Sequence, residues 1–213
     1  MLSVKNLNLK YTKEFYALED VSLEIDDGES VAFVGEAESG KTTLLRVLAK
    51  LEDFDSGEIY INHIPLKKID FKTDISVGYV PYCPVFLENK TVYENFRYIL
   101  NKKGFKPAEA EKLINNAIID FSIEKIIDEK VKNIRKEDKY ILSLIRLSFR
   151  KIDLLLVDNI FDEISDVYTE AIVSLIRKLK ENDTILILAC TRPEIAEKLC
   201  KRKIYFEHGK VVD

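Results

Sequence analysis

The chain has 213 residues, of which 46% are hydrophobic and 33% charged, and a formal net charge of −4. This composition excludes a disordered chain, and no apolar run approaches the ~20 residues of a membrane-spanning helix. The net charge argues against a nucleic-acid partner. The first residues show no secretory pattern. The three cysteines have no CxxC spacing, so we expect reduced cytoplasmic thiols.

The N-terminal part predicts short strands separated by turns, followed by one helix. The strand-forming segments are LSVKNLNLKY, ALEDVSLEI, SVAFVG and GEIYINHIPL, which are rich in β-branched and aromatic residues. The segment KTTLLRVLAK, at 41–50, carries its leucines and valine on one side and predicts a helix.

Helices dominate the next part, from about residue 86 to 150. Pro107 suits the first turn of a helix, where its missing N–H costs nothing, and an apolar stripe at helical spacing follows it. The segment 138–151 is apolar nearly all round, which predicts a buried helix.

Strand and helix alternate again in the last part. DLLLV and TILILA are continuously apolar, which is typical of a parallel sheet covered on both faces. The segment 166–182 between them predicts a helix with Ser165 as its N-cap. The fold class is therefore α/β, with a layered core at 1–85 and 150–213 and a helical subdomain at 86–149.

One strong chemical motif stands in the first part, GEAESGKT at 35–42. It follows a predicted strand and opens a predicted helix, which is the setting of a phosphate-binding P-loop. Gly35 and Gly40 let successive N–H groups converge on an anion, and the helix N-terminus adds its positive dipole end. Lys41 would reach the β- and γ-phosphates, and the hydroxyl of Thr42 would bind Mg²⁺.

Two further features modify this prediction. Glu36 and Glu38 lie inside the loop, where carboxylates repel a triphosphate unless they face solvent, so we expect lower affinity. Asp158 ends the apolar strand after residue 153, and we expect it to support the Mg²⁺ ion of the loop.

The order of these segments resembles the nucleotide-binding domain of ABC transporters along nearly the whole chain, 1–213. YALEDVSLEIDDGESVAFVGEAESGKTTLLRVLAKLEDFDSGEIYINH is similar to the family's opening stretch, and VGYVPY, TVYENF, RKIDLLLVDNIFDEIS and KIYFEHGKVVD follow in the family's order. The resemblance implies a P-loop NTPase core of ABC type with an N-terminal antiparallel β subdomain. It also implies that Tyr11 stacks on adenine and that ATP and Mg²⁺ are bound by a loop of Gly35, Glu36, Ala37, Glu38, Ser39, Gly40, Lys41, Thr42 and Thr43, with Thr42 and Asp158 at the metal.

The departures from the family pattern fall on the parts that position and activate water. Tyr82 replaces the glutamine that senses Mg²⁺ and the attacking water, Asn159 replaces the catalytic glutamate, and Cys190 replaces the switch histidine. The place of the LSGGQ-like signature falls on IRKED, residues 134–138, which contains no glycine and is expected to be a charged turn. Ser165 stands where the family has an aspartate. An amide cannot accept a proton, and a missing general base costs ~10²–10⁴ in rate, so we expect binding without efficient hydrolysis.

The resemblance implies head-to-tail pairs with ATP between the two domains, as a homodimer or heterodimer. We expect a partner that is an integral-membrane permease or a second ABC subunit, and a cytoplasmic location on the inner face of the membrane. The segment 86–96 is where the family contacts its permease. Two alternatives remain: an authentic transport ATPase with substitute residues, and a regulatory or scaffold protein that does not respond to nucleotide.

Overall fold

The contacts in the computed structural model, which describes residues 1–162 and 164–212, divide the chain into two units. The core unit comprises Met1–Tyr82, Ile152–Ser165 and Lys180–Asp213. The helical unit comprises Cys83–Lys151 and Asp166–Leu179. The segment from Asp166 therefore packs with the helical unit, although its sequence position placed it with the core. The subdomain limits at 86 and 149 stay a prediction.

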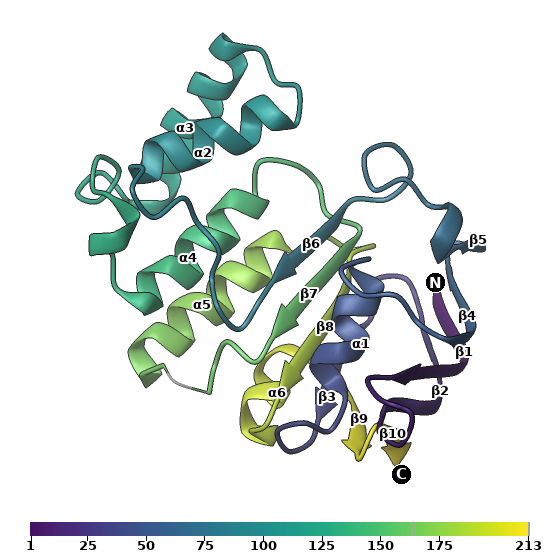
Figure 1. The fold of residues 1–213 in the computed structure, drawn as a ribbon. Coiled ribbons are helices and arrows are strands. Elements are labelled where there is room, and N and C mark those ends of the chain that lie inside the picture. The colour runs from purple at the N-terminus through teal and green to yellow at the C-terminus, as the bar shows by residue number, and fades with distance from the viewer. Residues whose placement is uncertain (163, 213) are drawn as a thin grey trace. The chain divides into compact units, whose positions relative to one another are not determined.

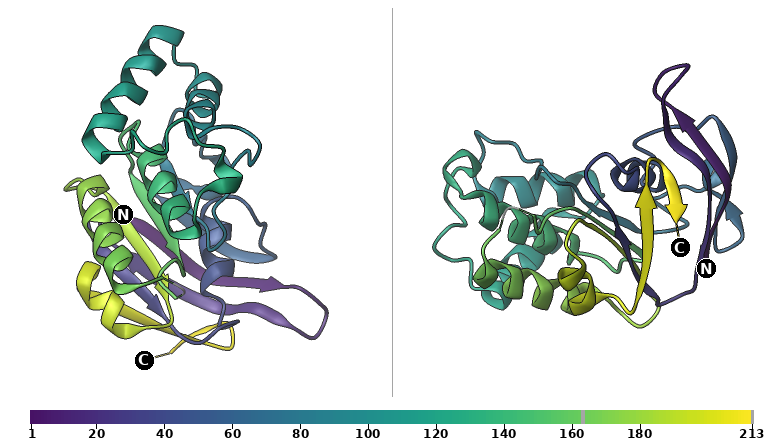
Figure 2. Two further views of the ribbon diagram at one scale, coloured as in Figure 1. Left: turned by 90° about the vertical axis from the view of Figure 1, so that its left-hand side faces the viewer. Right: turned by 90° about the horizontal axis from the view of Figure 1, so that it is seen from below.

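An antiparallel sheet of four strands forms one layer of the core unit, in the order β2-β1-β4-β5 (Figure 1). The strands are β1 (Leu2–Lys10), β2 (Tyr16–Ile25), β4 (Ser56–Ile61) and β5 (Ile64–Pro65). β1 and β2 run side by side over their whole length and are joined by a hairpin (Figure 2). Alternating residues of β2 are buried, as expected for a sheet with one face toward the core.

A six-stranded sheet forms the second layer, in the order β10-β9-β3-β8-β7-β6. All neighbouring pairs are parallel except β10 with β9. Its strands are β3 (Ser30–Val34), β6 (Val77–Val80), β7 (Leu154–Asp158), β8 (Ile185–Cys190), β9 (Arg202–Glu207) and β10 (Lys210–Val212). Every residue of β7 and β8 is buried, which confirms the predicted central strands of an α/β sheet.

Helix α1 (Lys41–Leu48) lies between the two sheets and joins them into one core (Figure 2). Its leucines and valine are fully buried, so the predicted apolar side of this helix is confirmed. Burying these chains contributes about 1.5–3 kcal/mol each. Helix α6 (Pro193–Leu199) contacts β3 and β8, and the short 3₁₀ helix η1 (Leu66–Lys68) follows β5.

The helical unit contains α2 (Val92–Lys102), α3 (Pro107–Phe121), η2 (Val131–Asn133), α4 (Lys136–Leu147) and α5 (Asp166–Leu179). Pro107 begins α3, as predicted, and none of the residues of α4 is exposed. The prediction of a charged turn at 134–138 is wrong, because α4 begins at Lys136, two residues before the start expected at 138. Glu137 and Asp138 fill its first turn, where acidic side chains favour the positive end of the helix dipole. Within residues 1–162 and 164–212, no helix is both long and apolar enough to cross a membrane.

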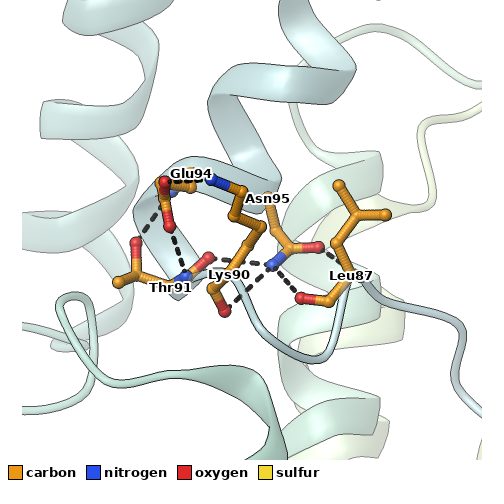
Figure 3. A network of polar contacts seen from close by, with 5 residues as sticks. All are labelled: Leu87, Lys90, Thr91, Glu94 and Asn95. Atoms are coloured by element: carbon orange, nitrogen blue, oxygen red, sulfur yellow. Dashed lines mark hydrogen bonds and ion pairs between the residues drawn. The ribbon is translucent and has the colours of Figure 1, made fainter.

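A buried asparagine orders the segment before α2 (Figure 3). Asn95 is 3% exposed. Its amide nitrogen donates to the carbonyls of Leu87 (3.1 Å) and Thr91 (2.8 Å), and its oxygen accepts from the N–H of Leu87 (2.8 Å). Thr91 and Glu94 form a reciprocal capping box at the start of the helix. The loop therefore takes its conformation from α2.

Replacement of Asn95 by alanine should destabilise the protein by about 2–4 kcal/mol, because a buried amide and its three hydrogen bonds to the backbone of Leu87 and Thr91 are lost. The free energy of unfolding from urea denaturation measures this loss. Asn101→Ala is the matched control, since Asn101 lies on the same helix but is exposed. Equal effects of the two substitutions would contradict the role of the Asn95 amide.

Candidate nucleotide-binding site

The site lies at the carboxyl ends of three adjacent parallel strands of the core unit. Register pairs Val34 at the end of β3 with Cys190 at the end of β8, and Asp158 at the end of β7 with Ala189. The segments that leave these strands therefore emerge at the same edge of the sheet, which is where ligands bind in α/β folds.

Two glycines of the loop 35–42 stand where a side chain would not fit. A Cβ on Gly35 would lie 2.3 Å from the carbonyl oxygen of Phe206. Gly40 has φ 103° at the N-cap of α1, and a Cβ there would lie 2.8 Å from the carbonyl oxygen of Ala17. The first N–H groups of a helix have no intrahelical acceptor, so this backbone presents donors to an anion.

Lys41 is held inside the loop by its own backbone. Its ammonium donates to the carbonyl oxygens of Gly35 (2.8 Å) and Glu36 (2.6 Å) and to the hydroxyl of Ser39 (2.9 Å). The side chain is 2% exposed, and burial lowers the pKa of the ammonium. A phosphate that draws Lys41 toward itself has to replace these three hydrogen bonds.

Thr42, Asp158 and Asn159 are in direct contact. The sequence placed Thr42 and Asp158 at one metal ion, whereas the contacts of Asn159 with them were not predicted. The hydroxyl of Thr42 donates to Oδ1 of Asp158 at 2.7 Å. The amide nitrogen of Asn159 lies 3.4 Å from that hydroxyl and 3.3 Å from the same carboxylate oxygen. Asn159 has φ 50°, a left-handed conformation that asparagine adopts more readily than most residues. Its Oδ1 is buried and has no hydrogen-bond partner among the described residues.

Tyr79 is a contact of this site that sequence reasoning missed. Its hydroxyl donates to Oδ2 of Asp158 at 2.9 Å. Burial raises the pKa of the Asp158 carboxyl, while the hydrogen bonds from Thr42 and Tyr79 oppose that rise. Burial and the nearby Asp158 also raise the pKa of Tyr79 itself. Its signal in the sequence was its position in VGYVPY, one residue before the end of strand β6, which pairs with β7.

An aromatic pair and the loop line a cavity of about 370 Å³. Tyr11 and Phe15 stack with ring centroids 6.4 Å apart, and both are about half exposed. The hydroxyls of Tyr11 and Thr43 are 3.2 Å apart, which ties the tyrosine ring to the first turn of α1. A role for Phe15 was not predicted from the sequence. Phe15 lines the cavity because the N–H of Tyr11 donates to its carbonyl across the hairpin. The cavity is lined by Tyr11, Phe15, Ala17, Ala37, Glu38, Ser39, Gly40, Lys41, Thr42, Thr43 and Asn159.

The two acidic residues of the loop, Glu36 and Glu38, are exposed. Their charges are therefore partly screened by solvent, which reduces their repulsion toward an anion. Glu38 has φ 64°, a left-handed conformation that costs an L-residue about 1–2 kcal/mol. Glu38 therefore adds backbone strain as well as charge to the loop.

The positions at which the sequence departs from the expected family pattern lie in different surroundings. Cys190 is fully buried, and burial raises the pKa of its thiol to about 11, so the thiol is neutral at physiological pH. Tyr82 is 37% exposed. The segment 134–138 belongs to the helical unit, where Arg135 pairs with Asp138 at 3.2 Å and lies over the ring of Tyr168. Its side chain is 73% exposed.

Comparison with known proteins agrees with this geometry. Residues 18–162 match the ABC transporter family. The methionine import ATP-binding protein MetN of Clostridioides difficile (strain 630) is 27% identical over the whole chain and 68% of its own length. The ABC transporter ATP-binding protein YxdL of Bacillus subtilis (strain 168) is 24% identical over 99% of the chain and 85% of its own length. A dimeric post-hydrolysis structure of the ATP-binding cassette MJ0796, bound to ADP and Pi, superposes with a TM-score of 0.88 and 24% identity, covering 100% of this chain and 97% of that one.

The fold and the site define a P-loop nucleotide-binding domain. The chain belongs to the ABC transporter family. The predicted fold class, an α/β ABC-type core with an N-terminal antiparallel sheet, is confirmed.

Replacement of Glu38 by glycine should raise ATP affinity in the presence of Mg²⁺ by about tenfold at low salt, which corresponds to about 1.4 kcal/mol of removed repulsion. It should also leave stability unchanged or raise it by about 1 kcal/mol, because left-handed strain is relieved. Glu38→Gln separates the two effects, since it removes the charge and keeps the strain. Calorimetric titration and urea unfolding measure them. Unchanged affinity in both variants would show that the carboxylate does not oppose the ligand.

The buried thiol of Cys190 should make stability fall at alkaline pH. The folded protein keeps this proton up to a pKa of about 11, whereas the unfolded chain releases it near ~8.5. Between these values the unfolded state binds fewer protons, so stability is fully present below pH ~8.5 and declines above it, by about 2 kcal/mol at pH 10. Urea unfolding of the wild type and Cys190→Ala at pH 7.5 and 10 measures this effect. Between the two pH values, the free energy of unfolding should fall by about 2 kcal/mol more in the wild type than in Cys190→Ala. Equal losses of stability in the two proteins would contradict the assignment of this pH dependence to Cys190.

Proposed function

We propose that this chain is the ATP-binding subunit of an ABC-type transporter or ABC-like complex, and that it holds Mg-ATP with weak or absent hydrolysis. The observation that carries the proposal is the 2.7 Å contact of Thr42 with Asp158, which lies beside the amide of Asn159 rather than beside a second carboxylate. The site keeps the groups that hold a metal triphosphate and has an amide where a base is needed.

The donor set fits Mg²⁺. The ion prefers oxygen ligands and is usually bound through one or two carboxylates together with substrate phosphates. Thr42 supplies a hydroxyl oxygen, Asp158 supplies a carboxylate, and the unpartnered Oδ1 of Asn159 is a further oxygen at the same place. No group of three His, Cys, Asp or Glu side chains suited to a metal occurs in residues 1–162 and 164–212, which agrees with an ion that takes its remaining ligands from phosphate and water. When bound, Mg²⁺ neutralises charge on the phosphates.

The remaining surfaces fit the rest of the nucleotide. Lys41 and the N–H groups of the loop would hold the phosphates, and the Tyr11 ring would stack on the base for about 1–3 kcal/mol. The stacked Phe15 extends the aromatic surface beside Tyr11. The loop residues proposed to line the nucleotide are Gly35, Glu36, Ala37, Glu38, Ser39, Gly40, Lys41, Thr42 and Thr43.

Hydrolysis needs a positioned water and an acceptor for its proton. The amide of Asn159 can hold a water by a hydrogen bond but cannot accept its proton. The neutral thiol of Cys190 is a weak hydrogen-bond donor, and burial keeps it protonated. Tyr82 replaces a glutamine that the family uses at this step. Because phosphoryl transfer depends on positioning and electrostatics, these replacements should act together.

The proposed partners follow from the relatives. Proteins named as import ATP-binding proteins, for methionine and ribose, are similar to nearly all of this chain. We propose a membrane permease or a second ABC subunit as the partner, and a position at the inner face of the membrane through it.

Binding is tested by calorimetric titration of ATP with Mg²⁺ into the wild type and Lys41→Met, which keeps the buried stem of the lysine and removes its ammonium. The wild type should bind, and the variant should lose at least tenfold in affinity. Lys72→Ala is the control, since Lys72 is exposed in a turn of the core unit. If the wild type does not bind ATP, the result would contradict the proposal and support a regulatory or scaffold protein that does not respond to nucleotide.

Hydrolysis is tested at position 159 with a matched pair of substitutions. Asn159→Glu supplies a base and should raise Mg-dependent phosphate release at least tenfold, below the ~10²–10⁴ of a complete site because the other replacements remain. Asn159→Gln has the same length without a base and should stay at the wild-type rate. Efficient turnover by the wild type would mean that substitute residues do the chemistry.

A further inference from the structure

The carboxylate of Asp158 is held from two sides by groups of different elements. Its Oδ1 accepts from Thr42 on α1, and its Oδ2 accepts from Tyr79 on β6. Asp158 is 1% exposed, so water does not take the place of either donor. The two oxygens therefore have distinct partners, and rotation of the carboxylate would break both contacts.

Sheet geometry explains why a tyrosine reaches this carboxylate. Tyr79 pairs with Leu156 on the neighbouring parallel strand β7. Because side chains alternate between the faces of a strand, Leu156 and Asp158 point to the same face. Tyr79 is thus a diagonal neighbour of Asp158, at a separation that long aromatic side chains span. A phenylalanine at 79 would fill the same space without the hydroxyl.

We propose that Tyr79 is a positioning residue for the metal site: its hydroxyl occupies Oδ2 of Asp158 and directs Oδ1 toward Thr42 and the Mg²⁺ ion of bound ATP. This inference rests on the proposed function. A hydrogen bond to a ligating carboxylate fixes its orientation, and loss of such a partner typically costs about 10–100-fold in metal affinity.

The role differs from that of a packing residue. Tyr79 is half-buried and packs against the hydrophobic core of the sheets. A purely structural role would therefore be retained by Tyr79→Phe, and its loss in Tyr79→Leu would affect nucleotide binding with and without metal alike. A positioning role is specific to the hydroxyl and to Mg²⁺. The two roles therefore predict different responses to removal of the metal.

The experiment measures ATP affinity by calorimetry in excess Mg²⁺ and in EDTA for the wild type, Tyr79→Phe and Tyr168→Phe. Tyr168 donates to Asp138 at 3.2 Å in the helical unit, so it is a tyrosine–aspartate pair that involves a carboxylate other than that of Asp158. Tyr79→Phe should weaken ATP binding about tenfold in Mg²⁺ and leave it unchanged in EDTA. Tyr168→Phe should change neither. Thermal unfolding checks that each variant is folded, and Tyr79→Leu serves as a second deletion of the hydroxyl.

The outcomes separate this inference from the proposed function. A wild type whose ATP affinity does not respond to Mg²⁺ would overturn the proposed metal site. A wild type that responds to Mg²⁺, together with a Tyr79→Phe protein that responds equally, would overturn the role of Tyr79 alone. A Tyr79→Phe protein that binds ATP like the wild type in both conditions, together with a Tyr79→Leu protein weakened by the same factor in Mg²⁺ and EDTA, would assign Tyr79 to packing.

Discussion

The site depends on one hydrogen bond, between the hydroxyl of Thr42 and the carboxylate of Asp158. The two residues are 116 positions apart in the sequence. They meet because β3 and β7 are both central strands of the six-stranded sheet, separated by β8, and end at the same edge. Burial of α1 between the sheets fixes Thr42 at that edge. The strand order, the phosphate loop and the packing of α1 all serve to bring these two oxygens together.

The same arrangement underlies our proposal that the site binds nucleotide without cleaving it. Holding a metal triphosphate requires backbone donors, one ammonium and a few oxygens, and these are built into the loop and the strand ends. Cleaving the triphosphate requires an additional proton acceptor and a positioned water. In our proposal Asn159 stands at the position of this acceptor, and Cys190, a buried neutral thiol, stands at the position of the switch residue. Asn159 itself contacts Thr42 and Asp158, so its amide belongs to the same cluster as the groups proposed to bind nucleotide. The proposal thus separates nucleotide binding from hydrolysis in this fold.

Much of this could be predicted from the sequence, because the signals were local. The spacing of Gly35, Gly40 and Lys41 between a strand and a helix predicted the loop, and a buried apolar run predicted the strand that ends at Asp158. Tyr79 and Phe15 were not predicted, because their roles depend on strand register and on hairpin pairing rather than on neighbouring residues. The start of α4 was also misplaced. Its charged first turn looked like solvent-exposed loop, whereas its acidic residues and the Arg135–Asp138 pair support a helix end.

The central claim is that Mg-ATP is held without being cleaved. Its most direct test is to mix the wild-type protein with a slight deficit of ATP in excess Mg²⁺, and to separate bound nucleotide from free and quantify it by chromatography over several hours. The account predicts that the protein-bound fraction remains ATP. Bound ADP that accumulates with a matching release of phosphate, within minutes, would contradict it.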